Sequence, residues 1–499
     1  ANTVTLTSAQ GITAPDIPAY TDSATGNVVN ASAINLTATK GNISANNVFS
    51  STLANSGNSG NGGNFTATAT QGDITLANVH SGAYVLGTGT AGNAGTVALN
   101  AGGNITVSGR VDSTTFGAVS QGTPGSIDLS ANRLSVGSIN TVKTDLFPTT
   151  SATVRSGNIA LTGNEINFTG GANRVIGTGT IWLQPLAVGQ NMVLGGATDS
   201  GATTLDLTAT DLAALQNGFS SIAIGRSDSS GTITFGGNVT FNDPVTFRSP
   251  ATSGSINTTG FTLTGADNAT INFLADGNIA TGNIVNPGRS IVLNSANGSI
   301  DTSNAFLNTS SANSSGGTIN FTAKTGINLG AIDTSTAATS STASAGTLSL
   351  NSSTGNILLN GDINTSAVAG SGSNLNFNNN VSLAKSLTIN TVGNAGSGSV
   401  IFNNSLDGTT AESQNLTLNA GTGNIAFSGA VGGSTSLGNL TANSTGATLF
   451  NAVSATSLTT NAGGTTQLNG NVNTAGKQTY GDAVVIANNP ILTGTEIAF

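Results

Sequence analysis

Short segments in which apolar and polar residues alternate recur throughout this chain, and glycine or asparagine separates one segment from the next. In the stretch 63–81, GNFTATATQGDITLANVHS, the alternating segments are 65–67, 74–76 and the residues around Val79. Alternation with a period of two is typical of strands that bury one face, and glycine or asparagine at the joints favours tight turns. The pattern therefore predicts a unit of three short strands.

The same unit is repeated along the chain at a nearly constant interval. Its copies begin at Ser32, Gly63, Gly95, Gly125 and Gly157, and the pattern resumes at Gly317 and Gly346. A unit this small cannot bury its own apolar face, but copies stacked on one another can. Each strand should then pair in parallel with its equivalent one coil away, at about 4.8 Å. We therefore predict an all-β fold, a three-sided parallel β-helix or β-solenoid.

Polar inserts of variable length follow the third segment of each unit, and we interpret them as loops. They occupy residues 51–62, 81–94, 114–124, 142–156, 303–316 and 335–345. Because each insert falls at the same point of its unit, we expect all of them to emerge at one corner of the solenoid.

A phenylalanine recurs at a fixed interval in the second half of the chain. The segments are LNFNNNV, VIFNNSL and IAFSGAV, and later TLFNAV and TQLNGNV occupy similar places. If one residue of each coil points inward at the same place, these side chains should stack as a ladder in the core. The predicted structural core ladder is Phe377, Phe402, Phe427, Phe450 and Leu468.

One stretch, TATDLAALQNGFSSIAIG, departs from the strand pattern. Leu212, Leu215 and Phe219 stand at helical spacing behind Thr210, and Gly218 is a stop signal, so a short inserted helix is predicted near 210–219. This stretch separates units with long inserts from units with short ones. The expected parts are an N-terminal solenoid over 1–180, an irregular junction over 181–250 and a C-terminal solenoid over 251–499.

Composition narrows the classes of function. Only 7% of the 499 residues are charged, 4% are aromatic, cysteine is absent, and the net charge is −9. The twelve Lys and Arg residues are scattered, which disfavours binding to nucleic acid, because that requires clustered contacts to phosphates. The chain contains no run of 18 apolar residues, the length needed to span a membrane as a helix. The absence of cysteine excludes disulfides and thiolate metal sites, and it is compatible with a secreted bacterial protein.

Candidate catalytic groups are sparse. The acidic residues considered are Asp73, Asp112, Asp128, Asp206, Asp267, Asp276, Asp301 and Asp362. Asp112 beside Arg110, and Asp276 with Asp301 one coil on, could form pairs, but aspartate at strand ends more often forms turns. His80 is the sole histidine and is expected to be an exposed polar residue beside an insert. We therefore assign no catalytic, cofactor-binding or metal-binding residue, expect no cofactor, and expect no enzyme activity.

A carbohydrate-active or carbohydrate-binding β-helix is the rival class. Binding would need exposed aromatic residues in register, but Tyr20, Tyr84, Trp182 and Tyr480 are too far apart in sequence to predict such a platform. A carbohydrate-active enzyme would need a tight carboxylate pair in a groove.

The repeats resemble a known class of protein. GGNITVSGRVDSTT (102–115) and GNIALTGNEINFTG (157–170) resemble the shafts of filamentous-haemagglutinin-like exoproteins of Gram-negative bacteria, cyanobacteria included, and the segment 194–239 is similar to a module that recurs in them. The resemblance implies a right-handed β-helix that crosses the outer membrane, often through a two-partner-secretion transporter, and serves in adhesion or the extracellular matrix. The Asn-Pro-Asn motif of the family's secretion domain is missing, so the resemblance is to the shaft alone.

These inferences together predict a structural extracellular protein, a β-helical rod that acts as a filament subunit or adhesin shaft at the cell surface. Residues 3–6 and the last residues of the chain already have strand-like alternation and no capping element. Either the sequence is a segment of a longer shaft, or its ends pair head to tail with other copies, and we favour the pairing. Other expected partners are cell-surface glycans, reached through the corner loops, and the outer-membrane transporter during export.

Overall fold

The computed structural model describes residues 2–117, 119–142, 157–199, 201 and 203–499. The chain is almost entirely β, and its strands pair in parallel, so the prediction of a parallel β-solenoid is confirmed. It divides into two compact units, Ala1–Arg248 and Ser249–Phe499. No helix in the described part of the chain combines the length and apolarity needed to cross a membrane.

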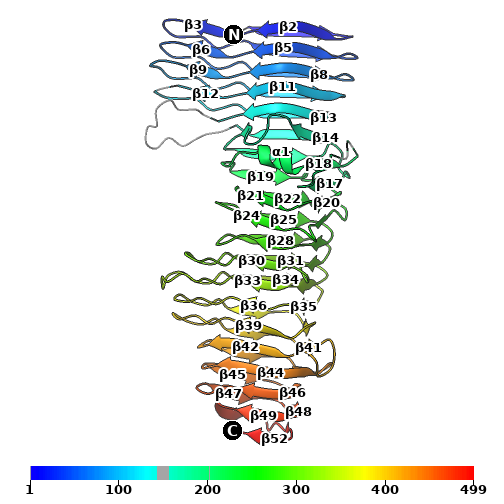
Figure 1. Cartoon of the computed structure of the whole chain (residues 1–499), viewed down its shortest axis with the longest axis vertical. Coiled ribbons are helices and arrows are strands. Elements are labelled where there is room, and N and C mark those ends of the chain that lie inside the picture. The colour runs from blue at the N-terminus through cyan, green and yellow to red at the C-terminus, as the bar shows by residue number, and fades with distance from the viewer. Residues whose placement is uncertain (1, 118, 143–156, 200, 202) are drawn as a thin grey trace. The chain divides into compact units, whose positions relative to one another are not determined.

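The first unit begins with three rows of parallel strands, and Figure 1 labels two of them, the row that starts at β2 (Ile12–Pro18) and the row that starts at β3 (Thr21–Ser23). The first row consists of β1 (Thr3–Ser8), β4 (Ala33–Ala38), β7 (Phe65–Ala69), β10 (Val97–Ala101) and the start of β13 (Ile127–Asn140). The second consists of β2, β5 (Ile43–Phe49), β8 (Ile74–His80), β11 (Asn104–Asp112) and the end of β13. Pairing is coil to coil: Val97 pairs with Phe65 on one side and with Ile127 on the other, and all three are buried. Inward positions of successive coils therefore form an apolar stack.

Three of the four strands of the third sheet of this unit lie inside the segments that the sequence pattern assigns to loops. This sheet contains β3 (Thr21–Ser23), β6 (Thr52–Ala54), β9 (Ala83–Val85) and β12 (Thr115–Phe116), again paired in parallel. The third segment predicted for each unit, around Val79 in its second copy, is the end of the second strand, β8. The interpretation of 51–62, 81–94 and 114–124 as plain loops is therefore wrong. The strands β6, β9 and β12 are only two or three residues long, so their alternating pattern cannot be recognised within polar sequence.

Beyond these short strands, the inserts of the first unit stack on one another. The Asn27 side-chain oxygen accepts a hydrogen bond from the Asn58 backbone N–H at 2.9 Å, and the Asn58 side chain accepts one from Thr90 at 2.8 Å. A small apolar cluster beneath them contains Val28, Ala54, Val85 and Ala91. Within this unit the inserts thus share one corner, as expected; the insert 142–156 lies, apart from Val142, outside the described residues.

The last part of the first unit is less regular. Its elements are β14 (Ile159–Phe168), β15 (Val175–Ile176), β16 (Thr180–Gln184), β17 (Met192–Leu194), β18 (Leu205–Leu207), α1 (Ala209–Ala214), β19 (Ser221–Ile224), β20 (Thr232–Phe235), β21 (Val239–Phe241) and β22 (Val245–Ser249). The predicted helix exists but is shorter than 210–219. Thr208, not Thr210, caps it through a capping box with Asp211, and Leu215 already has extended backbone angles. Phe219 is buried, but it lies outside the helix.

Most coils of the second unit contain three strands. The first face contains β25 (Ile271–Ala275), β28 (Ile291–Ser295), β31 (Ile319–Ala323) and β34 (Leu348–Ser352), then β37 (Leu375–Phe377), β40 (Val400–Phe402), β43 (Ile425–Phe427), β45 (Ala447–Phe450), β47 (Thr465–Leu468) and β50 (Ala483–Ile486). The second contains β23 (Ser255–Asn257), β26 (Ile279–Ala280), β29 (Ile300–Asp301), β32 (Ile327–Leu329), β35 (Ile357–Leu359), β38 (Val381–Leu383) and β41 (Leu406–Gly408).

The remaining strands of the second unit continue a third ladder. It contains β24 (Leu263–Gly265), β27 (Ile284–Val285), β30 (Phe306–Asn308), β33 (Ala331–Asp333), β36 (Ile363–Asn364), β39 (Leu387–Asn390), β42 (Leu416–Gly421), β44 (Leu437–Ser444), β46 (Val453–Thr460), β48 (Val472–Thr474), β49 (Lys477–Tyr480), β51 (Leu492–Thr493) and β52 (Glu496–Ala498). The insert 303–316 contains β30 and is therefore not all loop, whereas 335–345 holds no strand. Isolated bridges join Ser311 to Thr336 and Thr336 to Ala367, so the loops of this unit also stack at one corner.

A column of aromatic rings runs through the first face of the second unit. The ring centroids of Phe377 and Phe402 are 4.6 Å apart, those of Phe402 and Phe427 are 5.1 Å apart, and those of Phe427 and Phe450 are 5.3 Å apart. Leu468 pairs in register with Phe450, and it is fully buried. The rings are tilted by only 8° to 11° from one to the next, because parallel in-register pairing gives equivalent side chains the same direction.

Candidate functional site

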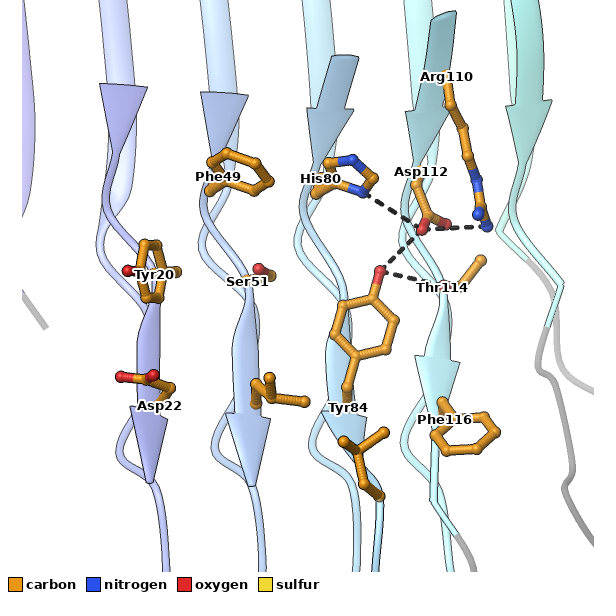
Figure 2. Close-up of a pocket in the computed structure, with 12 residues that line it drawn as sticks. Tyr20, Asp22, Phe49, Ser51, His80, Tyr84, Arg110, Asp112, Thr114 and Phe116 are labelled. Atoms are coloured by element: carbon orange, nitrogen blue, oxygen red, sulfur yellow. Dashed lines mark hydrogen bonds and ion pairs between the residues drawn. The ribbon is translucent and has the colours of Figure 1, made fainter. Parts of the chain in front are cut away.

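A groove of about 750 Å³ opens on the first unit between the ends of β5, β8 and β11 and the four-stranded sheet of β3, β6, β9 and β12. Figure 2 shows its walls, to which each coil contributes side chains at equivalent positions. The lining residues are Tyr20, Asp22, Phe49, Ser51, Leu53, His80, Tyr84, Leu86, Arg110, Asp112, Thr114 and Phe116. Most of this surface is aromatic or aliphatic, and a cluster of polar side chains around Asp112 lies at one end.

Register explains why these residues meet. Phe49 pairs with His80, and His80 pairs with Asp112, so one row of the groove crosses three coils. A second row contains Leu53, Tyr84 and Phe116, which are paired in the same way in the side sheet. Side chains at paired positions of parallel strands point in the same direction. The groove is thus the space between two outward rows that face each other across a turn.

Asp112 is the polar centre of the groove. Its Oδ2 atom accepts a hydrogen bond from the Tyr84 hydroxyl at 2.8 Å, and it lies 3.1 Å from Arg110 Nη2 and 3.6 Å from His80 Nδ1 (Figure 2). Burial, the largest single influence, raises the pKa of Asp112, but the His80 hydrogen bond, the Arg110 charge and the Tyr84 hydroxyl together bring that pKa below its usual value. The carboxyl is therefore held ionised although only 3% of the residue is exposed.

The same contacts fix the Tyr84 ring. Burial raises the pKa of Tyr84, and the neighbouring Asp112 charge raises it further, so the phenol stays neutral and donates its proton to the carboxylate. Thr114 Oγ1 lies 3.4 Å from the same hydroxyl. A ring held at its polar tip cannot turn away from the groove, which makes it a preorganised wall.

The open part of the groove is aromatic. The Phe49 and His80 rings stack at 5.3 Å with an interplanar angle of 7°, and Tyr20 meets Phe49 edge to face at 6.2 Å. Tyr20 is 51% exposed. Aromatic side chains such as these can pack against the C–H groups on one side of a ring-shaped ligand. The Asp112 carboxyl is ionised and hydrogen-bonded, so it is unsuited to donate a proton. This arrangement is suited to hold a ligand.

The groove corrects three sequence-based interpretations. Tyr20 and Tyr84, judged too far apart for a platform, line one groove because they lie only two coils apart. Asp112 is buried and pairs with Arg110, where a turn role was favoured, and His80 is half-buried against Phe49. The nearly equal sequence spacings from Phe49 to His80 and from His80 to Asp112 could have shown that these residues lie in one row.

The other residues considered lie elsewhere. Asp301 accepts a hydrogen bond from the Ser303 backbone N–H and has the role expected of a turn aspartate. Asp276 instead bridges coils, because it accepts hydrogen bonds from Ser253 and Asn297. Asp301 pairs in register with Ala280 and not with Asp276. Trp182 lies on β16, and Tyr480 is buried against Phe499, so neither contributes to the groove.

A second cluster of ionisable groups was missed from the sequence. Oxygens of Glu165, Asp199 and Asp206 all lie within 4.8 Å of one another. Burial, with a further contribution from the nearby Asp199 carboxylate, raises the pKa of Glu165 to about 8. No spacing rule relates these residues, because Asp199 and Asp206 belong to the irregular inserted segment.

Comparison with known proteins adds no assignment: no family model matches the chain, and neither the curated proteins nor the solved structures contain a match.

Proposed function

We propose that this chain is a structural protein of the extracellular surface of a Gram-negative bacterium, where its stacked coils serve as an adhesin shaft or a filament subunit. The observation that carries the proposal is the continuity of the parallel ladders within each unit. Each coil hydrogen-bonds to the coils on both sides of it, and equivalent inward residues such as Phe377 and Phe402 pack on one another. A scaffold of this kind gains length by adding coils, without a new core design.

The resemblance of the repeats to haemagglutinin-like shafts supports the same proposal. The outer corner of the first unit is also ordered, because asparagine side chains such as Asn27, Asn58 and Asn61 accept backbone hydrogen bonds from the next coil. A corner held in this way offers a repeating surface to other copies of the chain or to neighbouring cells. Head-to-tail and lateral self-association, with glycans as further ligands, are the contacts proposed.

Surface display can be tested directly in the producing bacterium. Antibodies raised against the purified chain should label intact cells, and protease added outside should remove the label. Negative-stain electron microscopy of shed material should show fibres or surface-bound shafts. Labelling that appears only after the outer membrane is opened would contradict the proposal.

The groove supports a second function, the binding of a saccharide chain. The observation in its favour is the aromatic row of Tyr20, Phe49 and His80, which lies beside donors and acceptors of Arg110 and Asp112. A sugar ring presents a C–H face to an aromatic ring and hydroxyl groups at its rim, and this groove offers partners for both. We propose that an unbranched oligosaccharide lies along the row, crossing successive coils.

Affinity electrophoresis in gels that contain soluble xyloglucan, glucomannan, dextran or alginate would test this function. At least one of these polysaccharides should retard the wild-type chain, and Tyr20→Ala or Phe116→Ala should remove most of the retardation. Phe306→Ala is the matched control, because Phe306 is 40% exposed on the second unit. Retardation by none of the four polysaccharides, or equal retardation of all variants, would contradict saccharide binding while leaving the shaft proposal intact.

A further inference from the structure

Three carboxylates meet where the irregular segment of the first unit lies against β14. Glu165 belongs to β14, Asp206 belongs to β18, and Asp199 lies in the connection between β17 and β18. Each side chain offers one oxygen, and the three oxygens lie within 4.8 Å of one another. Groups of like charge this close repel unless a cation or a proton lies between them.

The burial of Glu165 is a separate observation that points to a ligand. The residue is 0% exposed, and neither of its carboxylate oxygens accepts a hydrogen bond from any residue that the structure describes. Both oxygens are thus available at the position where Asp199 and Asp206 converge. A buried carboxyl group normally has hydrogen-bond partners or a metal ion, because the loss of its hydration is otherwise uncompensated.

The charge around the cluster is incompletely balanced. Arg133 pairs in register with Glu165, and its Nη2 atom lies 3.9 Å from an oxygen of Asp199. Both side chains of that ion pair are partly exposed to solvent, so the pair is loose. Cation binding requires all three carboxyl groups to be ionised, and three carboxylates with one guanidinium leave two negative charges, which a divalent cation would neutralise.

We propose that Glu165, Asp199 and Asp206 bind a divalent cation, and that the cation is Ca²⁺. All three donors are carboxylate oxygens, which suit hard cations, and no histidine or cysteine takes part in the cluster. Ca²⁺ binds oxygens at about 2.4 Å, so ligands on opposite sides of it can be about 4.8 Å apart. Mg²⁺, at about 2.1 Å, requires a tighter octahedron.

The ion would fasten the inserted segment to the regular coils. Other contacts already join the two: the Asp211 side chain accepts a hydrogen bond from the backbone N–H of Phe168, the last residue of β14, at 2.9 Å. Asp211 is held in turn by the capping box with Thr208. Ca²⁺ between Glu165 and the two aspartates would add a second attachment, and the fold of this segment would become dependent on the ion.

Titration calorimetry on the full chain tests the site. After treatment with EDTA and removal of the chelator, CaCl₂ should bind with a stoichiometry of one and an affinity on the order of 10⁻⁵ to 10⁻³ M. MgCl₂ should bind more weakly. Trp182, the chain's only tryptophan, lies on β16, which pairs with β14, and its fluorescence reports the unfolding of this region. The midpoint of that transition should be several degrees higher in CaCl₂ than in EDTA.

Variants separate this site from general binding of cations to an acidic chain. Glu165→Gln and Asp206→Asn should each weaken Ca²⁺ binding at least tenfold, whereas Asp301→Asn, a turn aspartate of the second unit, should leave it unchanged. Asp199 is exposed, so Asp199→Asn should fold even if the buried substitutions do not, and it should also weaken binding.

Two results would overturn the proposal. One is a wild-type chain that binds neither Ca²⁺ nor Mg²⁺ and unfolds at the same temperature with and without EDTA. The other is Ca²⁺ binding that Asp199→Asn leaves unchanged. Tighter binding of Mg²⁺ than of Ca²⁺ would overturn the choice of ion.

Discussion

The stacked phenylalanine column of the second unit predicts a large and local cost for removing one ring. Phe402 is 1% exposed, and its ring lies 4.6 Å from Phe377 and 5.1 Å from Phe427, nearly parallel to both. Replacing a buried Phe with Ala typically costs about 3–5 kcal/mol, which includes the cavity that remains. Because the coils on both sides are tied by their own backbone ladders, we expect little collapse and a value in the upper half of this range.

A stability change in a solenoid is not spread evenly over the chain. Each coil contacts mainly its neighbours, so Phe402→Ala should destabilise the coils that contain β37, β40 and β43 more than distant coils. Hydrogen exchange followed by mass spectrometry measures this, since it reports the local opening of each peptide. A cost of about 4 kcal/mol corresponds to opening that is about 1,000-fold more frequent. Peptides from β25 and β28 should exchange as in the wild type.

Two further variants make this experiment decisive. Phe402→Leu keeps most of the volume and should cost less than about 1.5 kcal/mol. Phe306→Ala removes an aromatic ring that is 40% exposed in the same unit and should change exchange very little. If Phe402→Ala has no larger effect than Phe306→Ala, or if protection falls evenly over both units, then the column does not stabilise the coils in the way argued above.

Three other perturbations follow from the structure. Asp112→Asn should destabilise the first unit by about 2 kcal/mol at pH 7. Because the folded-state pKa of Asp112 is lowered, the stability that its carboxylate contributes is present above a pH of about 4 and is lost below it. Urea titrations of the wild type and the variant should therefore converge in acid. Gly355→Ala would place a Cβ atom 1.9 Å from the Thr325 carbonyl oxygen, so it should destabilise by more than about 1 kcal/mol, measured as faster exchange in β34 and β35. Thr208→Ala removes the helix cap that bonds to Asp211 and should lower local stability by about 1 kcal/mol, read from tryptophan fluorescence.

The interior of this protein could be predicted from its sequence because the inward position of each coil is occupied by an apolar residue again and again. Ile34, Phe65, Val97 and Ile127 are one inward row, all apolar and all buried, and their spacing alone defines the coil. The Phe377 column is predictable for the same reason. The short helix was located, but its bounds were wrong, since its cap is Thr208 and the chain is already extended at Leu215.

The cluster of Glu165, Asp199 and Asp206 could not be predicted in this way. Asp199 and Asp206 lie in a segment that belongs to no repeat, so no coil-to-coil spacing places them beside Glu165. Only the packing of β18 against β14 brings the three carboxylates together. The repeat spacing of the sequence predicts which residues occupy equivalent positions in successive coils. It does not predict which coil residues an inserted segment will contact.

The groove falls between these two cases. Its rows obey the coil spacing, but the residue type changes from one coil to the next: Phe49, His80 and Asp112 are paired in one row although one is apolar, one is a weak base and one is acidic. Because inward residues fix the register, an outward residue can change on one coil without shifting its neighbours. A binding surface on a solenoid is therefore visible in the sequence only when the coils are aligned in register and their outward rows are read across the coils. Residues that are distant in sequence but only two coils apart, such as Tyr20 and Tyr84, then become neighbours in one site.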